Sequence, residues 1–240
     1  MKIFRYEVTD STNTRAREYA RLCNAEFPAV FVAEGQTEGR GRRGRSFDSE
    51  SGGGLYISFL FRPGDKTLDP AQITAKTAVD VCRAIDRACG LSVGIKWVND
   101  IFVSNKKLGG ILTEGEFDAD TGALSFAVCG IGINLFSRPF PEELSNIATT
   151  VEDELLEKPD KKLLEELLID EFFKENRNFI DEYRRRSTVI GKTVTVTRLS
   201  GESFSAKAID ITDTASLLVQ KEDGSREELI SAEVSINPSL

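Results

Sequence analysis

The segment Gly39–Arg45 reads Gly-Arg-Gly-Arg-Arg-Gly-Arg and so places four arginines and three glycines within seven residues. Guanidinium groups offer forked donors that suit carboxylate and phosphate oxygens, and glycines let the backbone approach a ligand closely. The segment therefore predicts a loop that binds a small anion. Taken alone, it is equally compatible with a flexible solvated loop or with an Arg-Gly contact to nucleic acid.

The composition removes whole classes of mechanism. The chain has 240 residues and no histidine, which excludes Ser-His-Asp and Cys-His catalysis and histidine-ligated zinc. Chemistry must rely on lysine, arginine, carboxylates and backbone dipoles. The formal charge of −8 argues against general affinity for nucleic acid, so any basic site must be local. The four cysteines lack CxxC spacing, and we expect them to pack as small buried hydrophobes rather than to bind metal.

Two further segments carry groups that could act on an anionic ligand. In Lys-Leu-Gly-Gly-Ile-Leu, Lys107 stands beside a predicted glycine turn that enters a strand, whereas its neighbour Lys106 is expected to face solvent. An ammonium group at Lys107 could act as a fixed charge against a phosphate. In Lys-Trp-Val-Asn-Asp, Asp100 is a magnesium candidate, because magnesium sites use one or two carboxylates with substrate phosphate and water. The alternative for Asp100 is an Asn-Asp turn.

The segment Asp10-Ser11-Thr12-Asn13 has two interpretations. Serine, threonine and asparagine are preferred helix N-caps, and on these residues alone capping is the favoured explanation. Hydroxyl groups at a helix N-terminus can also hydrogen-bond a polar ring, so the two roles do not exclude each other.

Five segments together resemble the biotin–protein ligase family. They are Asp10–Asn13, the arginine loop Gly39–Arg45, Gly52–Ser58, Lys96–Leu112 and Gly130–Asn134, in this order and spacing. The resemblance implies an α+β catalytic domain, akin to class II aminoacyl-tRNA synthetases, over residues 1–187. It implies an SH3-like β-barrel domain over residues 188–240, so the likeness covers almost the whole chain.

The resemblance also implies roles for individual residues. Lys107 and Arg40 would be catalytic, and Asp100 would hold magnesium. The residues that would bind biotin are Ser11, Thr12, Asn13, Gln36, Gly39, Arg40, Arg42, Lys107, Gly110 and Gly130. Those that would bind the nucleotide are Arg42, Arg45, Phe47, Trp97, Asn99 and Asn134. Trp97 could equally pack in the core.

Three residues depart from the family pattern. Val98 stands where the family usually has proline, Phe47 where many members have tryptophan, and Gly54 where asparagine is common. None of these changes removes a charged group. Phe47 keeps an aromatic surface that could cover an adenylate but lacks the indole N–H.

Helix and strand patterns interleave along the chain and predict one antiparallel-rich sheet. The spacing of apolar residues predicts helices over 70–89, begun by Asp69-Pro70, and over 160–183. Short apolar segments predict strands over 55–61, 94–97, 101–103, 110–114 and 124–129. After Ser187, closely spaced strands over 193–198, 203–211, 216–220 and 227–230 predict a small β-barrel.

The implied activity is ATP-dependent biotin ligation through biotinyl-5′-AMP, with magnesium as cofactor. The acceptor would be a lysine of a biotin carboxyl carrier domain, and a homodimer is left open. Only ten residues precede Ser11, so we expect no DNA-binding domain and no repressor role. The chain has no apolar run of about 18 residues and no secretory signal, so we expect a cytoplasmic protein. The alternatives are a lipoate–protein ligase, against which the arginine loop argues, and an RNA-binding module.

Overall fold

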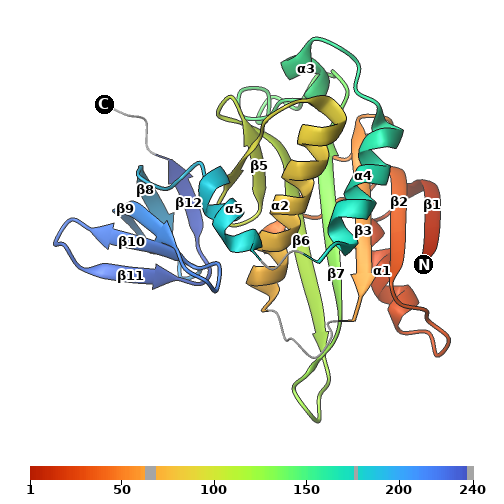
Figure 1. Cartoon of the computed structure of the whole chain (residues 1–240), viewed down its shortest axis with the longest axis horizontal. Helices are drawn as coiled ribbons and strands as arrows, with labels where there is room; N and C mark the ends of the chain where they lie inside the picture. Colours follow the sequence, from red (N-terminus) through yellow and green to blue (C-terminus); the bar gives the residue numbers. More distant parts are fainter. Residues whose placement is uncertain (63–68, 176–177, 237–240) are drawn as a thin grey trace.

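The computed structural model describes residues 1–62, 69–175 and 178–236. Its larger part is built on a seven-stranded sheet in the order β1-β2-β3-β7-β6-β5-β4 (Figure 1). The strands are β1 (Lys2–Thr9), β2 (Ala29–Gln36), β3 (Gly54–Phe61), β4 (Gly94–Lys96), β5 (Asp100–Val103), β6 (Lys106–Phe117) and β7 (Leu124–Asn134). Strands β1 and β2 pair in parallel, whereas the other neighbours are antiparallel. The predicted α+β class with an antiparallel-rich sheet is confirmed.

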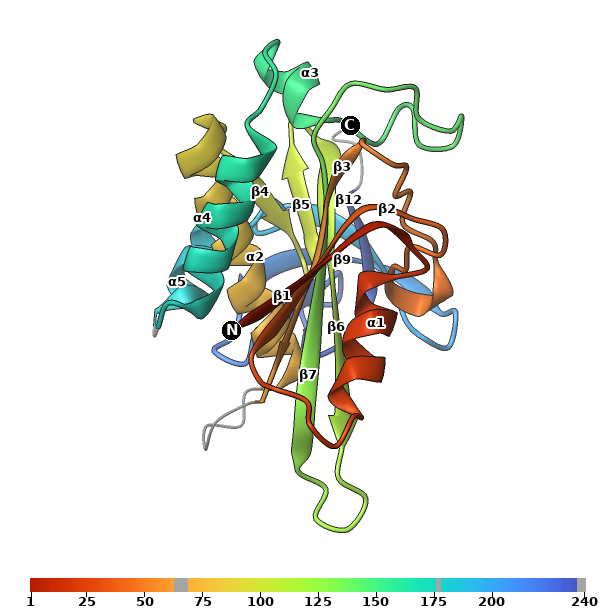
Figure 2. The ribbon, with the colours of Figure 1, turned by 90° about the vertical axis from the view of Figure 1, so that its right-hand side faces the viewer.

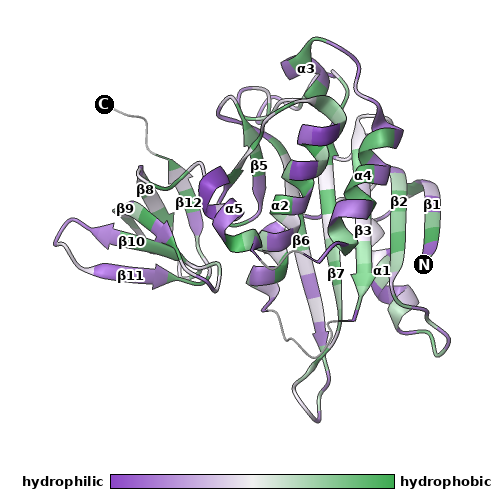
Figure 3. Ribbon diagram, viewed as in Figure 1, coloured by the Kyte–Doolittle hydropathy of each residue, from purple (hydrophilic) through white to green (hydrophobic). Residues whose placement is uncertain are grey.

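Helices cover both faces of this sheet. Helix α1 (Thr12–Ala20) lies on one face, and α2 (Pro70–Cys89), α4 (Lys161–Phe173) and α5 (Phe179–Arg186) lie on the other (Figure 2). Alternation along β2 explains the two cores, since Phe31 packs in the cluster with Ala16 of α1 while Val30 and Val32 belong to the main cluster under α2. Figure 3 shows the apolar residues concentrated in the central strands and polar residues along the outer sides of the helices.

The predicted helix after Asp69 is confirmed with both of its caps. The Asp69 side chain accepts a hydrogen bond from the Ala71 N–H, and Gln72 completes a capping box. At the other end Gly90 adopts the left-handed conformation, with φ of 64°. These local signals fix the helix boundaries without reference to the rest of the fold.

The single helix predicted over 160–183 is wrong, because the chain forms two helices there. Helix α4 ends at Phe173 and α5 begins at Phe179; residues 176 and 177 lie outside the described part. Phe172 stacks on Phe59 of the sheet at 3.9 Å between ring centroids, while the Tyr183 hydroxyl donates to the Val98 carbonyl at 2.9 Å. With two separate helices, Phe172 can pack on the sheet and Tyr183 can bond to Val98, each helix in its own orientation.

Strands β6 and β7 are longer than predicted. The segment Gly130–Asn134, which lies beyond the strand predicted over 124–129, continues β7 and pairs with both β3 and β6. The expectation for the cysteines holds for Cys82 and Cys129, which are buried, but Cys23 is exposed. No helix among the described residues is long and apolar enough to cross a membrane.

The C-terminal segment forms a second, five-stranded antiparallel sheet in the order β11-β10-β9-β8-β12. Its strands are β8 (Thr193–Thr197), β9 (Ser203–Ile211), β10 (Leu217–Lys221), β11 (Arg226–Leu229) and β12 (Glu233–Ile236). Strands β11 and β12 are its two edges, so the predicted barrel is an open sheet in the described residues. Strand β12 was missed from the sequence. It pairs with β8 and lies on the side of this sheet nearest the larger domain (Figure 1).

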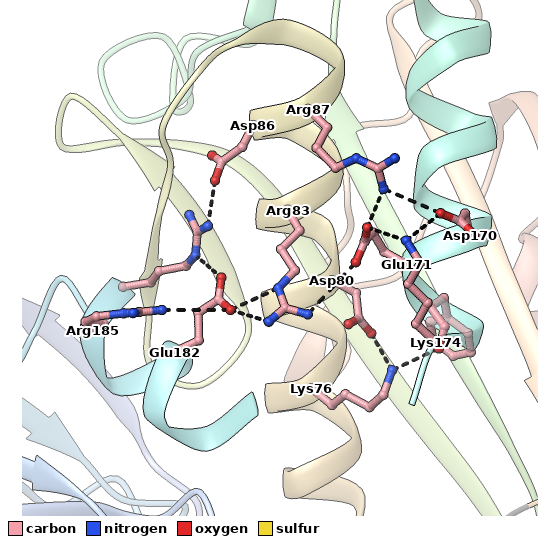
Figure 4. Close-up of polar contacts among 12 residues, drawn as sticks. Lys76, Asp80, Arg83, Asp86, Arg87, Asp170, Glu171, Lys174, Glu182 and Arg185 are labelled. Carbon is pink, nitrogen blue, oxygen red and sulfur yellow. Dashed lines mark hydrogen bonds and ion pairs between the residues drawn. The ribbon is translucent and has the colours of Figure 1, made fainter. Parts of the chain in front are cut away.

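Ion pairs connect α2 to α4 and α5 (Figure 4). Arg83 binds Glu182 of α5, and Arg87 binds Glu171 of α4. Within α2 itself, Lys76 binds Asp80 at 2.7 Å. Asp80 is fully buried, and its Oδ1 atom has no hydrogen-bond partner within the described residues. Burial therefore raises the pKa of Asp80 from 3.8 to about 7, against the opposing effect of Lys76.

The raised pKa predicts that Asp80 destabilises the fold as the pH rises. A carboxyl group whose folded pKa exceeds its unfolded pKa favours folding when protonated, and this contribution disappears between pH 4 and pH 7. We expect Asp80→Asn to match wild type in urea unfolding below about pH 4 and to be about 2–4 kcal/mol more stable at pH 8. Asp118→Asn is the control, since the Thr121 hydroxyl lowers the pKa of Asp118 and reverses the sign. A pH-independent difference for Asp80→Asn would contradict the expectation.

Candidate active site

A cavity of about 180 Å³ opens on the α1 face of the large sheet. The walls come from the start of α1, the end of β2, the arginine loop, the β4–β5 turn, the middle of β6 and β7, and β12. The lining residues include Ser11, Thr12, Asn13, Gln36, Arg40, Arg42, Arg43, Arg45, Phe47, Lys96, Trp97, Asn99, Asp100, Lys107, Gly110, Gly130, Gly132 and Glu233. Strand alternation places Gly110, Leu112, Gly130 and Gly132 on this face, and the register shift between β5 and β6 at Leu108 brings Lys107 to the same side.

A network of neutral polar groups forms at the start of α1. Gln36 Oε1 accepts from the Thr12 N–H at 2.8 Å and lies 3.1 Å from the Thr12 hydroxyl oxygen. Ser58 Oγ lies 2.7 Å from Thr12 Oγ1 and 2.6 Å from Asn13 Oδ1. Ser11 holds the N-cap position but makes no side-chain capping bond within the described residues. Ser11 also lines the cavity.

Two glycines of β7 make room for side chains above the sheet. A Cβ atom on Gly130 would lie 2.1 Å from Asn13 Oδ1, and one on Gly132 would lie 2.5 Å from a ring carbon of Phe47. Neither position therefore tolerates a larger residue without a shift. The glycines predicted to leave space for a ligand also leave space for Asn13 and Phe47.

The arginine loop is a folded turn. Its ends are joined by a bridge between Arg40 and Ser46, and the Gly41 N–H donates to the Arg45 carbonyl at 2.7 Å. A short 3₁₀ turn, Arg42–Gly44, forms the tip, and Arg43 adopts a left-handed conformation with φ of 58°. This turn directs Arg40 and Arg42 toward separate partners and Arg43 and Arg45 toward the same carboxylate.

Three of the loop arginines pair with carboxylates. Arg40 lies 2.8 Å from Glu114 of β6, and Glu233 of β12 lies 2.5 Å from Arg45 and 3.6 Å from Arg43. Arg42 differs, since its Nη1 donates to the amide oxygen of Asn99 at 3.2 Å and it forms no ion pair within the described residues. Burial and the neighbouring Arg43 lower the pKa of Arg42. Arg42 thus presents a partly desolvated cation to the cavity, with no ion-pair partner in the part of the chain that the structure describes.

Lys107 and Asp100 face each other across β5 and β6. Lys107 Nζ lies 2.6 Å from Asp100 Oδ1, and the side chain passes close to Gly110. The turn before Lys107 is formed by Ser104 and Asn105, both with positive φ, so the predicted glycine turn is wrong. Lys106 is exposed, as predicted.

Trp97 serves both packing and the cavity wall. It is buried, and its Nε1 donates at 2.8 Å to the carbonyl of Ala215, which lies between β9 and β10. The following residue, Val98, is held by the hydrogen bond from Tyr183, and the Trp97–Val98 peptide bond is cis. The turn that carries Asn99 and Asp100 is therefore fixed from two sides.

Most of the predicted site residues meet in this one cavity. The exceptions are Gly39 and Asn134, which are not among the residues that line it. Gly39 packs against Ser49 and the Phe47 carbonyl, where a Cβ atom would lie 2.3 and 2.4 Å away. Asn134 is buried, and its Nδ2 donates to the Thr149 carbonyl at 3.2 Å.

Two charged residues at the cavity had no predicted role. Lys96 is half-buried there, and burial lowers its pKa. Glu233 lies on β12, more than a hundred residues after the other charged residues of the cavity. The alternation Ala232, Val234, Ile236 could have revealed β12 as a strand, but no sequence signal indicated that it would dock beside the arginine loop.

Residues 6–134 match the Biotin/lipoate A/B protein ligase family, and residues 189–236 match the Biotin protein ligase C terminal domain. The first match alone covers more than half of the chain. This protein belongs to the biotin/lipoate A/B protein ligase family, and its relatives there are biotin protein ligases.

Two relatives illustrate the match. The chain is 32% identical to the bifunctional ligase/repressor BirA of Bacillus subtilis, over 96% of this chain and 73% of the relative. It is 31% identical to the biotin–[acetyl-CoA-carboxylase] ligase of Mycobacterium tuberculosis, over 85% of this chain and 76% of the relative. Among solved structures, the biotin protein ligase of Aquifex aeolicus in complex with biotin and ATP superposes with a TM-score of 0.81, at 27% identity over 99% of both chains.

Proposed function

We propose that this protein activates biotin with ATP and transfers it to a lysine of a biotin carboxyl carrier domain. The observation that carries the proposal is the single cavity in which hydroxyl and amide groups of α1 and β2 meet Lys107 and the arginine loop. Biotin combines a neutral ureido ring with a carboxylate, and this combination suits both sets of groups. Family membership supports the same chemistry.

The neutral groups would bind the ring of biotin. Ser11, Thr12 and Gln36 offer donors and acceptors next to the N-terminus of α1. Asn13 and the adjoining glycine Gly130 would form the floor of the same pocket, because their close contact excludes a side chain there. Gly39 does not line the cavity. It would instead shape the arginine loop, because it packs closely against the Phe47 carbonyl.

The cations would bring two anions together. The carboxylate of biotin attacks the α-phosphorus of ATP, the bond to the β-phosphate bridging oxygen breaks, and pyrophosphate leaves with that electron pair. Arg40, Arg42 and Lys107 would neutralise the charge that builds up on the reacting phosphate, so alignment and electrostatics suffice without a proton shuttle. The absence of histidine is compatible with this reaction.

The remaining lining residues would hold the nucleotide and its metal. Phe47 offers a flat apolar surface, and Arg45, Trp97 and Asn99 line the same cavity; Asn134, outside its wall, would support the end of β7. Asp100 supplies one carboxylate, and the described residues contain no group of three or more metal-ligating side chains. This donor set fits magnesium, which is commonly held by one or two carboxylates together with substrate phosphates. Magnesium bound there would supply charge neutralisation on the phosphates.

In the second half-reaction, the amine of a carrier lysine attacks the carbonyl carbon of biotinyl-5′-AMP. An amide bond forms, AMP leaves, and the amine loses a proton to solvent. The acceptor would be the carrier domain of a biotin-dependent carboxylase or decarboxylase. The reaction fits a cytoplasmic enzyme, because its first half consumes ATP.

One incubation tests the proposal against its alternatives. The protein is mixed with ATP, magnesium and labelled biotin, labelled lipoate or labelled RNA in separate arms. Acid-labile biotinyl-adenylate is the expected product, and its transfer to a purified carrier domain is the expected second step. Lipoyl-adenylate alone would identify a lipoate ligase, and RNA retention without either adenylate would identify a binding module.

The role of Asp100 predicts a metal-specific defect. We expect Asp100→Asn to require a higher magnesium concentration and to lower ATP-dependent turnover by about 10-fold or more, with biotin affinity changed less than twofold. The measurements are magnesium titrations of adenylate synthesis and biotin binding by calorimetry. Equal losses in both would instead indicate that Asp100 acts by positioning Lys107.

A further inference from the structure

Glu233 is an acidic residue inside a cavity otherwise rich in cations. It lies on β12, the edge strand of the C-terminal sheet that meets the arginine loop. Arg45 Nη2 lies 2.5 and 2.6 Å from its two carboxylate oxygens, and Arg43 Nη1 lies 3.6 Å from Oε2. One carboxylate thus holds two arginines of the loop.

The electrostatics keep this carboxylate charged. The hydrogen bond from Arg45 is the main cause of the lowered pKa of Glu233, and the charges of Arg43 and Lys96 act in the same direction. In return, Glu233 opposes the effect of burial on the pKa of Lys96. Arg43 and Arg45 therefore share Glu233 as a counter-ion, and its charge also acts on Lys96.

We propose that Glu233 is an internal competitor of ATP, which neutralises Arg43 and Arg45 until the triphosphate of the nucleotide displaces it. This inference rests on the proposed function. A carboxylate and a phosphate present similar paired oxygens to a guanidinium group, so the same cations can bind either. The affinity for ATP and pyrophosphate is then reduced by the free energy of the pairs that must be broken, and release of pyrophosphate is correspondingly easier.

The geometry allows the exchange. Arg45 is 67% exposed and Glu233 35% exposed in their side chains, and ion pairs with this much solvent contribute little to stability. The backbone of Glu233 stays fixed, because β12 pairs with β8 and the flanking Ala232 and Val234 are buried. Only side chains need to move.

The other carboxylate on the loop is less suited to this role. Glu114 pairs with Arg40 at 2.8 Å, but it also accepts a hydrogen bond from Asn13 Nδ2 at 2.8 Å and lies 3.3 Å from Arg17. Displacing Glu114 would disturb the start of α1, where biotin is proposed to bind. Among the described residues, the Glu233 side chain pairs only with Arg43 and Arg45 of the loop.

The test is Glu233→Gln in the full chain, with binding measured by calorimetry. We expect ATP and inorganic pyrophosphate to bind about 3- to 10-fold more tightly, because two solvent-accessible ion pairs no longer compete. Adenosine, which has no phosphate, and biotin should bind as to wild type. Glu222→Gln removes the same charge from an exposed turn of the same sheet and should leave all four affinities unchanged. Glu233→Ala should repeat the direction of the effect.

Two results would overturn the inference. Unchanged or weaker binding of ATP and pyrophosphate by a folded Glu233→Gln would show that Glu233 supports the nucleotide site rather than competing for it. Equal tightening of adenosine would show a reshaped cavity instead of phosphate competition. Because the pyrophosphate arm requires no turnover, failure of the wild-type chain to form biotinyl-adenylate would reject the proposed function while leaving the competition measurable.

Discussion

Replacing Lys107 by alanine is expected to lower the rate of biotinyl-adenylate synthesis about 10²- to 10³-fold, the usual effect of removing one preorganised electrostatic donor. The Lys107 ammonium is fixed by Asp100 at 2.6 Å, and its backbone is held by hydrogen bonds to residues 147 and 149. The charge is therefore in place before substrate binds. The measurement is single-turnover formation of labelled biotinyl-5′-AMP under saturating biotin and ATP.

The variant should fold normally, because its side chain is partly exposed and β6 retains its pairing with β5 and β7. Lys106→Ala is the matched control, as Lys106 is the exposed neighbour on the same strand. It should retain wild-type rates. Near-normal turnover of Lys107→Ala, or an equal loss in Lys106→Ala, would remove Lys107 from the mechanism.

The parts of the fold that could be predicted are those whose signals are local. Helix α2 is specified by a capping box at Asp69 and a glycine at position 90, and both act within one turn of the helix. The break between α4 and α5 has no comparable signal. It depends on where Phe172 and Tyr183 find partners in the sheet and in the β4–β5 turn, which are distant in sequence.

The candidate site also combines features that short sequence segments predict with contacts that depend on the whole fold. The spacing of the five segments identified residues that the sheet brings into one cavity, since Gly110 and Gly130 lie on the same face of β6 and β7. Lys107 reaches that face only through the register shift between β5 and β6. Their mutual contacts were not predictable. That Gln36 would bond the Thr12 amide, or that Glu233 would pair with Arg45, follows from strand order and from the docking of the second sheet.

Arg42→Ala is expected to release biotinyl-5′-AMP about 10- to 100-fold faster, corresponding to the loss of one or two charged hydrogen bonds. Arg42 is the loop arginine without an ion pair in the described residues, so an anionic ligand would be its first counter-ion. Contacts made only with ligand can offset the entropy of ordering a loop rich in glycine and arginine. Binding and closure of the loop would then be coupled.

The released adenylate is a reactive anhydride, so the Arg42 variant should label lysines on bystander proteins indiscriminately. The measurements are labelling of added serum albumin and amide hydrogen exchange across residues 39–47, with and without biotin and ATP. Wild type should gain protection in the loop on binding and label little albumin. Arg21→Ala, which removes an exposed arginine paired with Glu116 outside the cavity, should behave as wild type. Equal loop protection in both states, together with normal retention of the adenylate by Arg42→Ala, would show that the loop binds substrate without acting as a lid.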